Sequence, residues 1–263
     1  MRVDLAKGIA YVLLPLALAL PASGEAQVFG AEEGLEITVG GGVDLVNQYV
    51  WRGFVWNGTP NIQPYLWVAT EQLEFGGWAS HSFDEAFHEQ DFWLTYYFPG
   101  SRLGNLSLTI NDYYENPDFG EDFFDFAGIG PCPEDESGYG TPGRCAQGAH
   151  TMEVVGEFSG AAQPIDLLFA YNFHNDPENA MYAEAAFRPL LGPLELRLTV
   201  GGVLRDSEWW YETEGTTLTN VSAGVSALLE RGRFSAPLAA EVTYNPYFEE
   251  TYFVARVGIA GEL

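Results

Sequence analysis

Charged side chains recur at every second position within apolar segments of the sequence, and these charges could select ions. In the segment 193–201, Glu195, Arg197 and Thr199 alternate with leucine and valine residues. A segment with this period has one apolar and one polar face. If the polar faces enclose a lumen, its carboxylates would attract cations and repel anions. The candidate lumen and selectivity residues on these faces are Asp44, Glu74, Asp91, Glu153, Glu157, Asp166, Glu184, Arg188, Glu195, Arg197, Glu241 and Arg256.

The arginines in this set leave two possibilities for the lumen, a plugged barrel or a conducting pore. Arg188, Arg197 and Arg256 lie on segments that would be neighbours or would close a barrel. Each guanidinium could pair with a nearby carboxylate and form a bridge across a narrow lumen, which would plug it. A lumen in which the carboxylates dominate would instead conduct cations.

Residue types suited to hydrolysis occur in the chain, but nothing joins them into a catalytic group. His81 and Ser82, and the segment 174–176, supply a histidine, a hydroxyl and amide or carboxylate partners. Adjacent residues of a strand point to opposite faces of the sheet, so neighbouring side chains in these two groups cannot act together. The glycines at 40–42 precede no helical pattern, which argues against a nucleotide site. We expect neither a catalytic site nor a cofactor.

Cys132 and Cys145 are separated by thirteen positions in an acidic stretch rich in glycine and proline. In an exported protein such a pair favours a disulfide that holds a loop together. Two cysteines without suitably spaced histidines do not make a zinc centre, and the nearby carboxylates lack the spacing of a calcium-binding hand. We therefore expect a disulfide and no metal site.

The period-two pattern predicts an all-β protein, a single transmembrane antiparallel β-barrel of about twelve strands. A soluble β-sandwich or lipocalin-like barrel is the rival fold, because it also alternates apolar and polar residues. The expected strands are 35–47, 61–70, 73–83, 88–98, 104–114, 149–159, 164–174, 179–188, 193–204, 217–229, 236–245 and 250–260.

The connections between these segments alternate in length. The three longest, 48–60, 115–148 and 205–216, all follow odd-numbered segments. Outer-membrane barrels have short periplasmic turns and longer extracellular loops, so 115–148 is the predicted long extracellular loop and both termini are predicted to be periplasmic. Aromatic residues gather near segment ends, as at 209–211, where we expect them to form girdles at the membrane interfaces.

The first residues resemble a cleaved signal peptide. Arg2 and Lys7 precede an apolar run at 9–20 that is too short to span a bilayer, and small residues follow it. The prediction is a signal peptide at 1–26 and one barrel domain at 27–263, exported to a Gram-negative-type outer membrane. Membrane lipids and the outer-membrane assembly machinery are the expected partners, and the oligomeric state is open.

The chain has a net charge of −26. Phosphate contacts need lysine or arginine, so nucleic acid is not an expected partner. The acidity is compatible with adaptation to high salt, where self-repulsion is screened, and equally with acidic extracellular loops.

The stretch 49–53, Tyr-Val-Trp-Arg-Gly, is followed by Pro60, Gln63 and then 75–80, Phe-Gly-Gly-Trp-Ala-Ser. It resembles the TorF-type family of bacterial outer-membrane porins, whose members have a Tyr-x-x-Arg-Gly element after the first strand. The resemblance covers about forty residues and implies an outer-membrane barrel with a transport-related function. No catalytic residues follow from it. The chain departs from the usual pattern at its end, which lacks a C-terminal aromatic residue.

Within the 49–53 element, the residue types suggest a rim structure. Trp51 could anchor at the membrane interface, and Gly53 would allow a sharp turn. Arg52 could then bend inward over the acidic lumen and act as a gate or selectivity residue.

Together these patterns predict a porin-like channel for passive diffusion of small solutes, favouring cations or neutral polar solutes. The alternative is a closed barrel with a structural or adhesive role, and an outer-membrane enzyme is the least favoured class.

Overall fold

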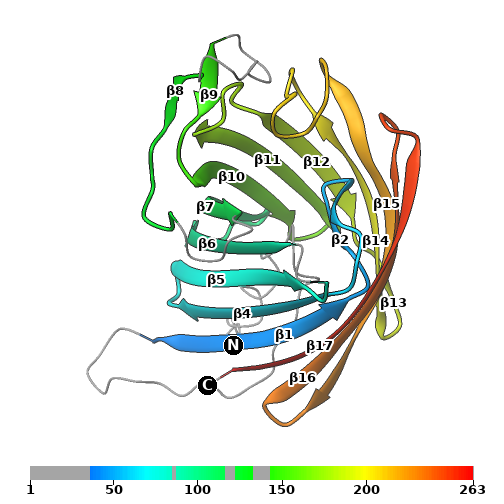
Figure 1. Cartoon of the computed structure of the whole chain (residues 1–263). Helices are drawn as coiled ribbons and strands as arrows, with labels where there is room; N and C mark the ends of the chain where they lie inside the picture. The colour runs from blue at the N-terminus through cyan, green and yellow to red at the C-terminus, as the bar shows by residue number, and fades with distance from the viewer. Residues whose placement is uncertain (1–35, 85–86, 116–121, 133–142, 263) are drawn as a thin grey trace.

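The fold is a closed antiparallel β-barrel, seen in a computed structural model that describes residues 36–84, 87–115, 122–132 and 143–262 (Figure 1). Within these residues, twelve strands form the wall and the predicted all-β fold is confirmed. Every strand boundary falls within three residues of its predicted position. The wall strands are β1 (Thr38–Val46), β4 (Asn61–Ala69), β5 (Leu73–Ser82), β6 (His88–Tyr97), β7 (Gly104–Glu115), β10 (His150–Gly160), β11 (Ile165–His174), β12 (Met181–Phe187), β14 (Leu194–Val203), β15 (Thr217–Arg231), β16 (Phe234–Asn245) and β17 (Glu250–Glu262).

Wall strands that follow one another in the chain pair with each other, and β1 pairs with β17 to close the ring. At the closure, Val43 lies opposite Ile259 on one side and opposite Pro64 on the other. A closed ring leaves no strand edge, so the backbone hydrogen bonds of the wall are made within it.

The outer surface of the wall is apolar. Leu66 is 64% exposed and Ile259 is 62% exposed, and similar side chains repeat on the outward positions of the other strands. Apolar surface this extensive is unstable in water and matches the hydrocarbon of a bilayer. The barrel is therefore a transmembrane barrel, and the soluble sandwich is excluded. None of the residues that the structure describes belongs to a helix long and apolar enough to span a membrane.

The two ends of the barrel differ in their connections. At one end, named here the turn end, short turns join the strands, including one that contains β13 (Leu190–Leu191). At the other, the loop end, the connections carry the hairpins β2 (Tyr49–Trp51) with β3 (Phe54–Asn57), and β8 (Ile129–Pro131) with β9 (Arg144–Ala146). In Figure 1 the green β8–β9 hairpin and β13 lie at opposite ends of the wall. The predicted signal peptide and parts of the 115–148 loop lie outside the described residues.

Candidate functional site: the barrel lumen

The β2–β3 hairpin folds inward into the barrel (Figure 1). Arg52 and Gly53 form its turn, with φ angles of 50° and 91°. Positive φ at both central residues is typical of the tight hairpin turn whose twist matches its strands. A side chain at Gly53 would place its Cβ 1.8 Å from the carbonyl oxygen of Thr219, so only glycine fits. The hairpin tip is thus seated directly against the inner wall.

Hydrogen bonds hold the tip in place. The Asn245 side chain donates from Nδ2 to the carbonyl oxygen of Gly53 at 2.9 Å, and the Thr219 hydroxyl donates to the carbonyl oxygen of Arg52 at 3.3 Å. Thr219 lies on β15 and Asn245 on β16. The hairpin therefore docks on two wall strands far from it in sequence.

The Arg52 side chain crosses to the other side of the lumen and pairs with Glu153 on β10. Its two terminal nitrogens meet the two carboxylate oxygens at 2.5 and 3.0 Å, and Nη1 also donates to the Tyr211 hydroxyl at 2.7 Å. Arg52 is 5% exposed and Glu153 is 1% exposed. Two-point pairing of this kind is the strongest form of guanidinium–carboxylate contact. We name this pair the latch.

Further contacts surround the two side chains of the latch. The guanidinium lies 4.3 Å from the ring centre of Trp51 and 4.8 Å from that of Tyr182, both within cation–π range. Tyr113 donates its hydroxyl to Glu153 at 2.8 Å. Burial lowers the pKa of Arg52, but the facing Glu153 carboxylate raises it, and the net pKa lies well above its ordinary value. The predicted inward position of Arg52 agrees with this structure.

Aromatic rings fill the lumen around the latch. The Trp51 ring stacks on Tyr211 with centroids 5.7 Å apart and on Trp56 at 5.9 Å, and Trp210 meets it edge-on at 6.1 Å. Phe54 packs against Tyr211 at 5.3 Å. We name this cluster the aromatic plug; it consists of Tyr49, Trp51, Phe54, Trp56, Trp210 and Tyr211.

Three residues predicted for the membrane interfaces belong to the aromatic plug instead. Trp51 is 2% exposed, and Trp210 and Tyr211 are buried beside it. The interfacial prediction was wrong for these residues because their loops fold into the lumen, where ring stacking and the buried latch provide partners that a bilayer interface lacks.

At the turn end, the other arginines pair with carboxylates along the wall. Arg188, just past β12, donates to Asp166 of β11 at 2.7 Å and lies 3.8 Å from Glu195 of β14. Arg197 lies 3.2 Å from Glu184 and 3.5 Å from Asp166. These pairs join neighbouring or next-but-one strands, so they follow the wall and do not cross the lumen.

The same pattern holds on the opposite side of the ring, where Arg256 of β17 lies 3.5 Å from Asp44 of β1. Glu74 accepts hydrogen bonds from the Trp93 indole at 2.7 Å and from the Tyr97 hydroxyl at 3.2 Å, and Glu241 accepts one from Thr243 at 2.9 Å. The strand periodicity places Asp91 and Glu157 on the same enclosed face, where Asp91 is buried and Glu157 half-buried. The structure thus brings the predicted lumen residues onto one surface.

A cavity of about 90 Å³ lies beside the hairpin. It is lined by three guanidiniums and two carboxylates, together with hydroxyl and amide groups. A space of this size and polarity has room for several waters. The charged lining residues are Arg52, Arg197, Arg256, Glu184 and Glu241.

Several contributors to the site were not predicted from the sequence. Glu89 is 1% exposed on the inner face of β6 and accepts a long hydrogen bond from Tyr49 at 3.4 Å. The alternation within the 88–98 segment could have identified it. Tyr113 and Tyr182 also have inward positions on their strands, whereas the role of Tyr211 had no local signal because it lies in a loop without periodicity.

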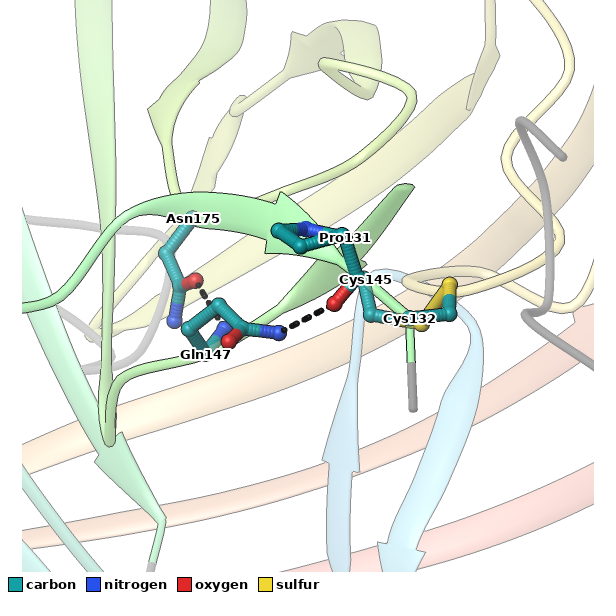
Figure 2. Close-up of a disulfide and its surroundings, with 5 residues drawn as sticks. All are labelled: Pro131, Cys132, Cys145, Gln147 and Asn175. Atoms are coloured by element: carbon teal, nitrogen blue, oxygen red, sulfur yellow. Dashed lines mark hydrogen bonds between the residues drawn. A yellow bond between two sulfur atoms is a disulfide. The ribbon is translucent and has the colours of Figure 1, made fainter. Parts of the chain in front are cut away.

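The predicted disulfide is confirmed. Cys132 and Cys145 are bonded beside the β8–β9 hairpin (Figure 2). Gln147 ties this hairpin to its surroundings, since its side chain donates to the Pro131 carbonyl at 3.3 Å and its backbone N–H donates to the Asn175 side chain at 3.0 Å. The bond therefore closes a loop-end segment that contacts the connection after β11.

The residues considered for hydrolysis have other partners. The Nδ1 atom of His81 faces Nδ1 of His88 at 3.0 Å, and the Ser82 hydroxyl donates to the Phe87 carbonyl at 3.3 Å. Asn175 donates to the Gly148 carbonyl at 2.8 Å. No catalytic triad forms from these residues. In the part of the chain that the structure describes, no group of three or more histidine, cysteine or acidic residues is placed to hold a metal ion.

No family model matches the sequence, and neither does any curated protein. Among solved structures, the chain is similar to the KdgM porin, with 6% identity over 85% of this chain and 98% of that one and a TM-score of 0.42. An outer membrane channel from Pseudomonas putida F1 has 10% identity, coverage of 90% and 100%, and a TM-score of 0.43. The translocator domain of the autotransporter NalP from Neisseria meningitidis has 10% identity, coverage of 88% and 90%, and a TM-score of 0.37. Fold and lumen define a transmembrane β-barrel with an inward-folded hairpin.

Proposed function

We propose that this protein is an outer-membrane channel for passive diffusion of small solutes, and that the β2–β3 hairpin controls its opening. The observation that carries the proposal is a lipid-facing wall around an enclosed, charge-lined lumen. A barrel that served only as a membrane anchor would not need arginines and carboxylates on its inner face, because burying charged groups costs free energy unless they are paired or hydrated. The polar lining is what a hydrated path requires.

The charge of the lining supports a preference for cations or neutral polar solutes. The proposed lumen set contains nine carboxylates, to which Arg52 and three other arginines are opposed. Four arginines cannot neutralise nine carboxylates, and a net negative pore lining concentrates cations. Polar side chains that line the cavity, such as Gln63 and Asn220, could also form hydrogen bonds with uncharged solutes.

The proposed orientation follows from the two barrel ends. Long loops in outer-membrane barrels are extracellular and short turns periplasmic, so the loop end would face outward and both termini would lie in the periplasm. In this orientation the latch and the aromatic plug stand at the outer entrance. We also propose membership of the TorF-type family, on the 49–53 element, and delivery by the outer-membrane assembly machinery.

The test is single-channel recording in planar bilayers under a salt gradient. The key variant replaces residues 48–59, which contain the hairpin, with a short turn. We expect larger conductance steps in the variant than in the unaltered protein, with a cation-favouring reversal potential in both. Heat-dependent gel mobility would verify that each barrel is folded. An anion-favouring potential would contradict the proposed selectivity.

A closed structural or adhesive barrel is the second candidate, because the aromatic plug occupies the loop end of the lumen. This alternative predicts that both proteins fold correctly and that neither conducts. Function would then belong to the loops, including the disulfide-bonded segment at 115–148. Conduction only after the hairpin is removed would instead support a gated channel.

A further inference from the structure

Two histidines face each other on the outer side of the wall, away from the lumen. His81 of β5 and His88 of β6 are directly paired across the two strands, next to the turn at the loop end. Their Nδ1 atoms are 3.0 Å apart, their ring centres are 5.1 Å apart and their planes are inclined by 56°. Both side chains are half-buried and lie at the loop-end tips of their strands, where the wall leaves the bilayer in the proposed orientation, so an ion from solution can reach them.

The spacing of the two nitrogens suits joint coordination of one metal ion. Imidazole nitrogens lie about 2.1 Å from a bound first-row transition metal. Two such ligands at adjacent positions of a square-planar or octahedral ion, about 90° apart, lie about 3.0 Å from each other. The observed Nδ1–Nδ1 distance of 3.0 Å meets this requirement. The backbone pairing of β5 with β6 holds the two residues opposite each other before any ion arrives.

The surroundings favour capture of a cation. A net charge of −26 raises the local concentration of divalent cations around the protein. Carboxylates favour hard ions such as Mg²⁺ and Ca²⁺, whereas imidazole favours Ni²⁺, Cu²⁺ and Zn²⁺. The pair can therefore select a transition metal from a mixture in which the acidic side chains are occupied by harder ions.

We propose that His81 and His88 form a binding site for a divalent transition-metal ion, with both Nδ1 atoms as ligands. In the metal-free pair, one Nδ1–H donates to the other Nδ1. On binding, the donor ring carries its proton on Nε2 instead, and both Nδ1 lone pairs face the ion. The site is independent of the channel function proposed above.

The bound ion would cross-link the loop-end tips of β5 and β6. The turn between them is already closed by hydrogen bonds between Ser82 and Phe87 at 3.0–3.3 Å. On the inner side, the Phe87 ring packs on Tyr49 of the hairpin with centroids 6.0 Å apart. Metal binding therefore stabilises the segment that supports one edge of the aromatic plug.

The experiment is calorimetric titration of the folded, untagged mature protein with Ni²⁺ in the presence of excess Mg²⁺, which occupies the carboxylates. We expect one saturable site in the unaltered protein and in His174→Ala, the matched control with another half-buried histidine near the loop end. The saturable heat should disappear in His81→Ala and in His88→Ala. Ni²⁺ should raise the thermal unfolding temperature of the unaltered protein but not of these two variants, because a ligand stabilises only the state that binds it.

Two results would overturn the proposal. Saturable binding that persists in His81→Ala or His88→Ala would place the site elsewhere, and loss of all Ni²⁺ heat in excess Mg²⁺ would assign it to carboxylates. His81→Asn and His88→Asn keep a polar side chain in place, and heat-dependent gel mobility shows whether every variant is folded.

Discussion

The two halves of the lumen use charged residues in opposite ways, although the same strands line both. At the loop end, Arg52 and Glu153 are almost fully buried and enclosed by stacked rings. Toward the turn end, Arg188 and Arg197 pair along the wall with carboxylates that are less completely buried than the latch. A fully buried pair is costly to break because one partner is left uncompensated, whereas a pair that water can reach contributes less. The loop-end half therefore holds the hairpin in place, and in the proposed channel the turn-end half would contribute charge to the pore lining.

The largest effect is expected from Glu153→Ala, which removes one partner of the latch. Arg52 would remain buried without a counter-charge, and such a loss costs about 3–5 kcal/mol. Urea unfolding followed by tryptophan fluorescence should show this destabilisation, since Trp51, Trp56 and Trp210 all lie in the plug. Channel conductance should rise as the hairpin leaves its seat. A Glu153→Ala protein with unchanged stability and conductance would contradict the role of the latch.

The hairpin turn offers a smaller and more local test. Gly53→Ala should cost about 1–3 kcal/mol, because alanine disfavours the φ of 91° and its Cβ would overlap the Thr219 carbonyl. The matched control is Gly58→Ala, where the nearest atom to a new Cβ is 3.9 Å away on Val55. The same unfolding assay should separate the two variants. Equal stabilities would show that the tip is not seated against β15.

At the turn end, Glu195→Ala should change stability by only about 0–1 kcal/mol, because its contact with Arg188 is long at 3.8 Å and partly exposed. Its effect should appear in selectivity, since one negative charge leaves the lining. The reversal potential under a salt gradient should shift toward weaker cation preference. A large loss of stability would show that the turn-end pairs are structural, as the latch is.

The smallest effect on the barrel is expected from reduction of the Cys132–Cys145 bond. The bond lies in a loop-end segment outside the wall and outside the aromatic plug. Reduction should leave heat-dependent gel mobility and conductance unchanged, while limited proteolysis within 115–148 becomes faster. Loss of the folded gel band after reduction alone would show that the loop supports the barrel.

Much of the wall could be predicted because its side-chain pattern is local. In the segment 193–201, leucines at every second position define the lipid face, and Glu195 and Arg197 follow as inward residues. The path of the hairpin was only partly predictable. The residue types of Arg52 and Gly53 suggested an inward turn, but nothing near them identified Glu153, which lies 101 positions away, as the partner.

The sequence by itself determined the number of strands, their lipid-facing sides and the disulfide, because each depends on residue types and their local spacing. Only the tertiary structure decided how the loops and charges are arranged inside the ring. Trp51 and Tyr211 stack although 160 positions separate them, and Arg52 finds its counter-charge across the lumen. Such contacts depend on which surfaces meet when the barrel closes, and no local pattern encodes them. Whether a tryptophan at a strand end enters the bilayer interface or the lumen is settled by the partners that the closed ring provides.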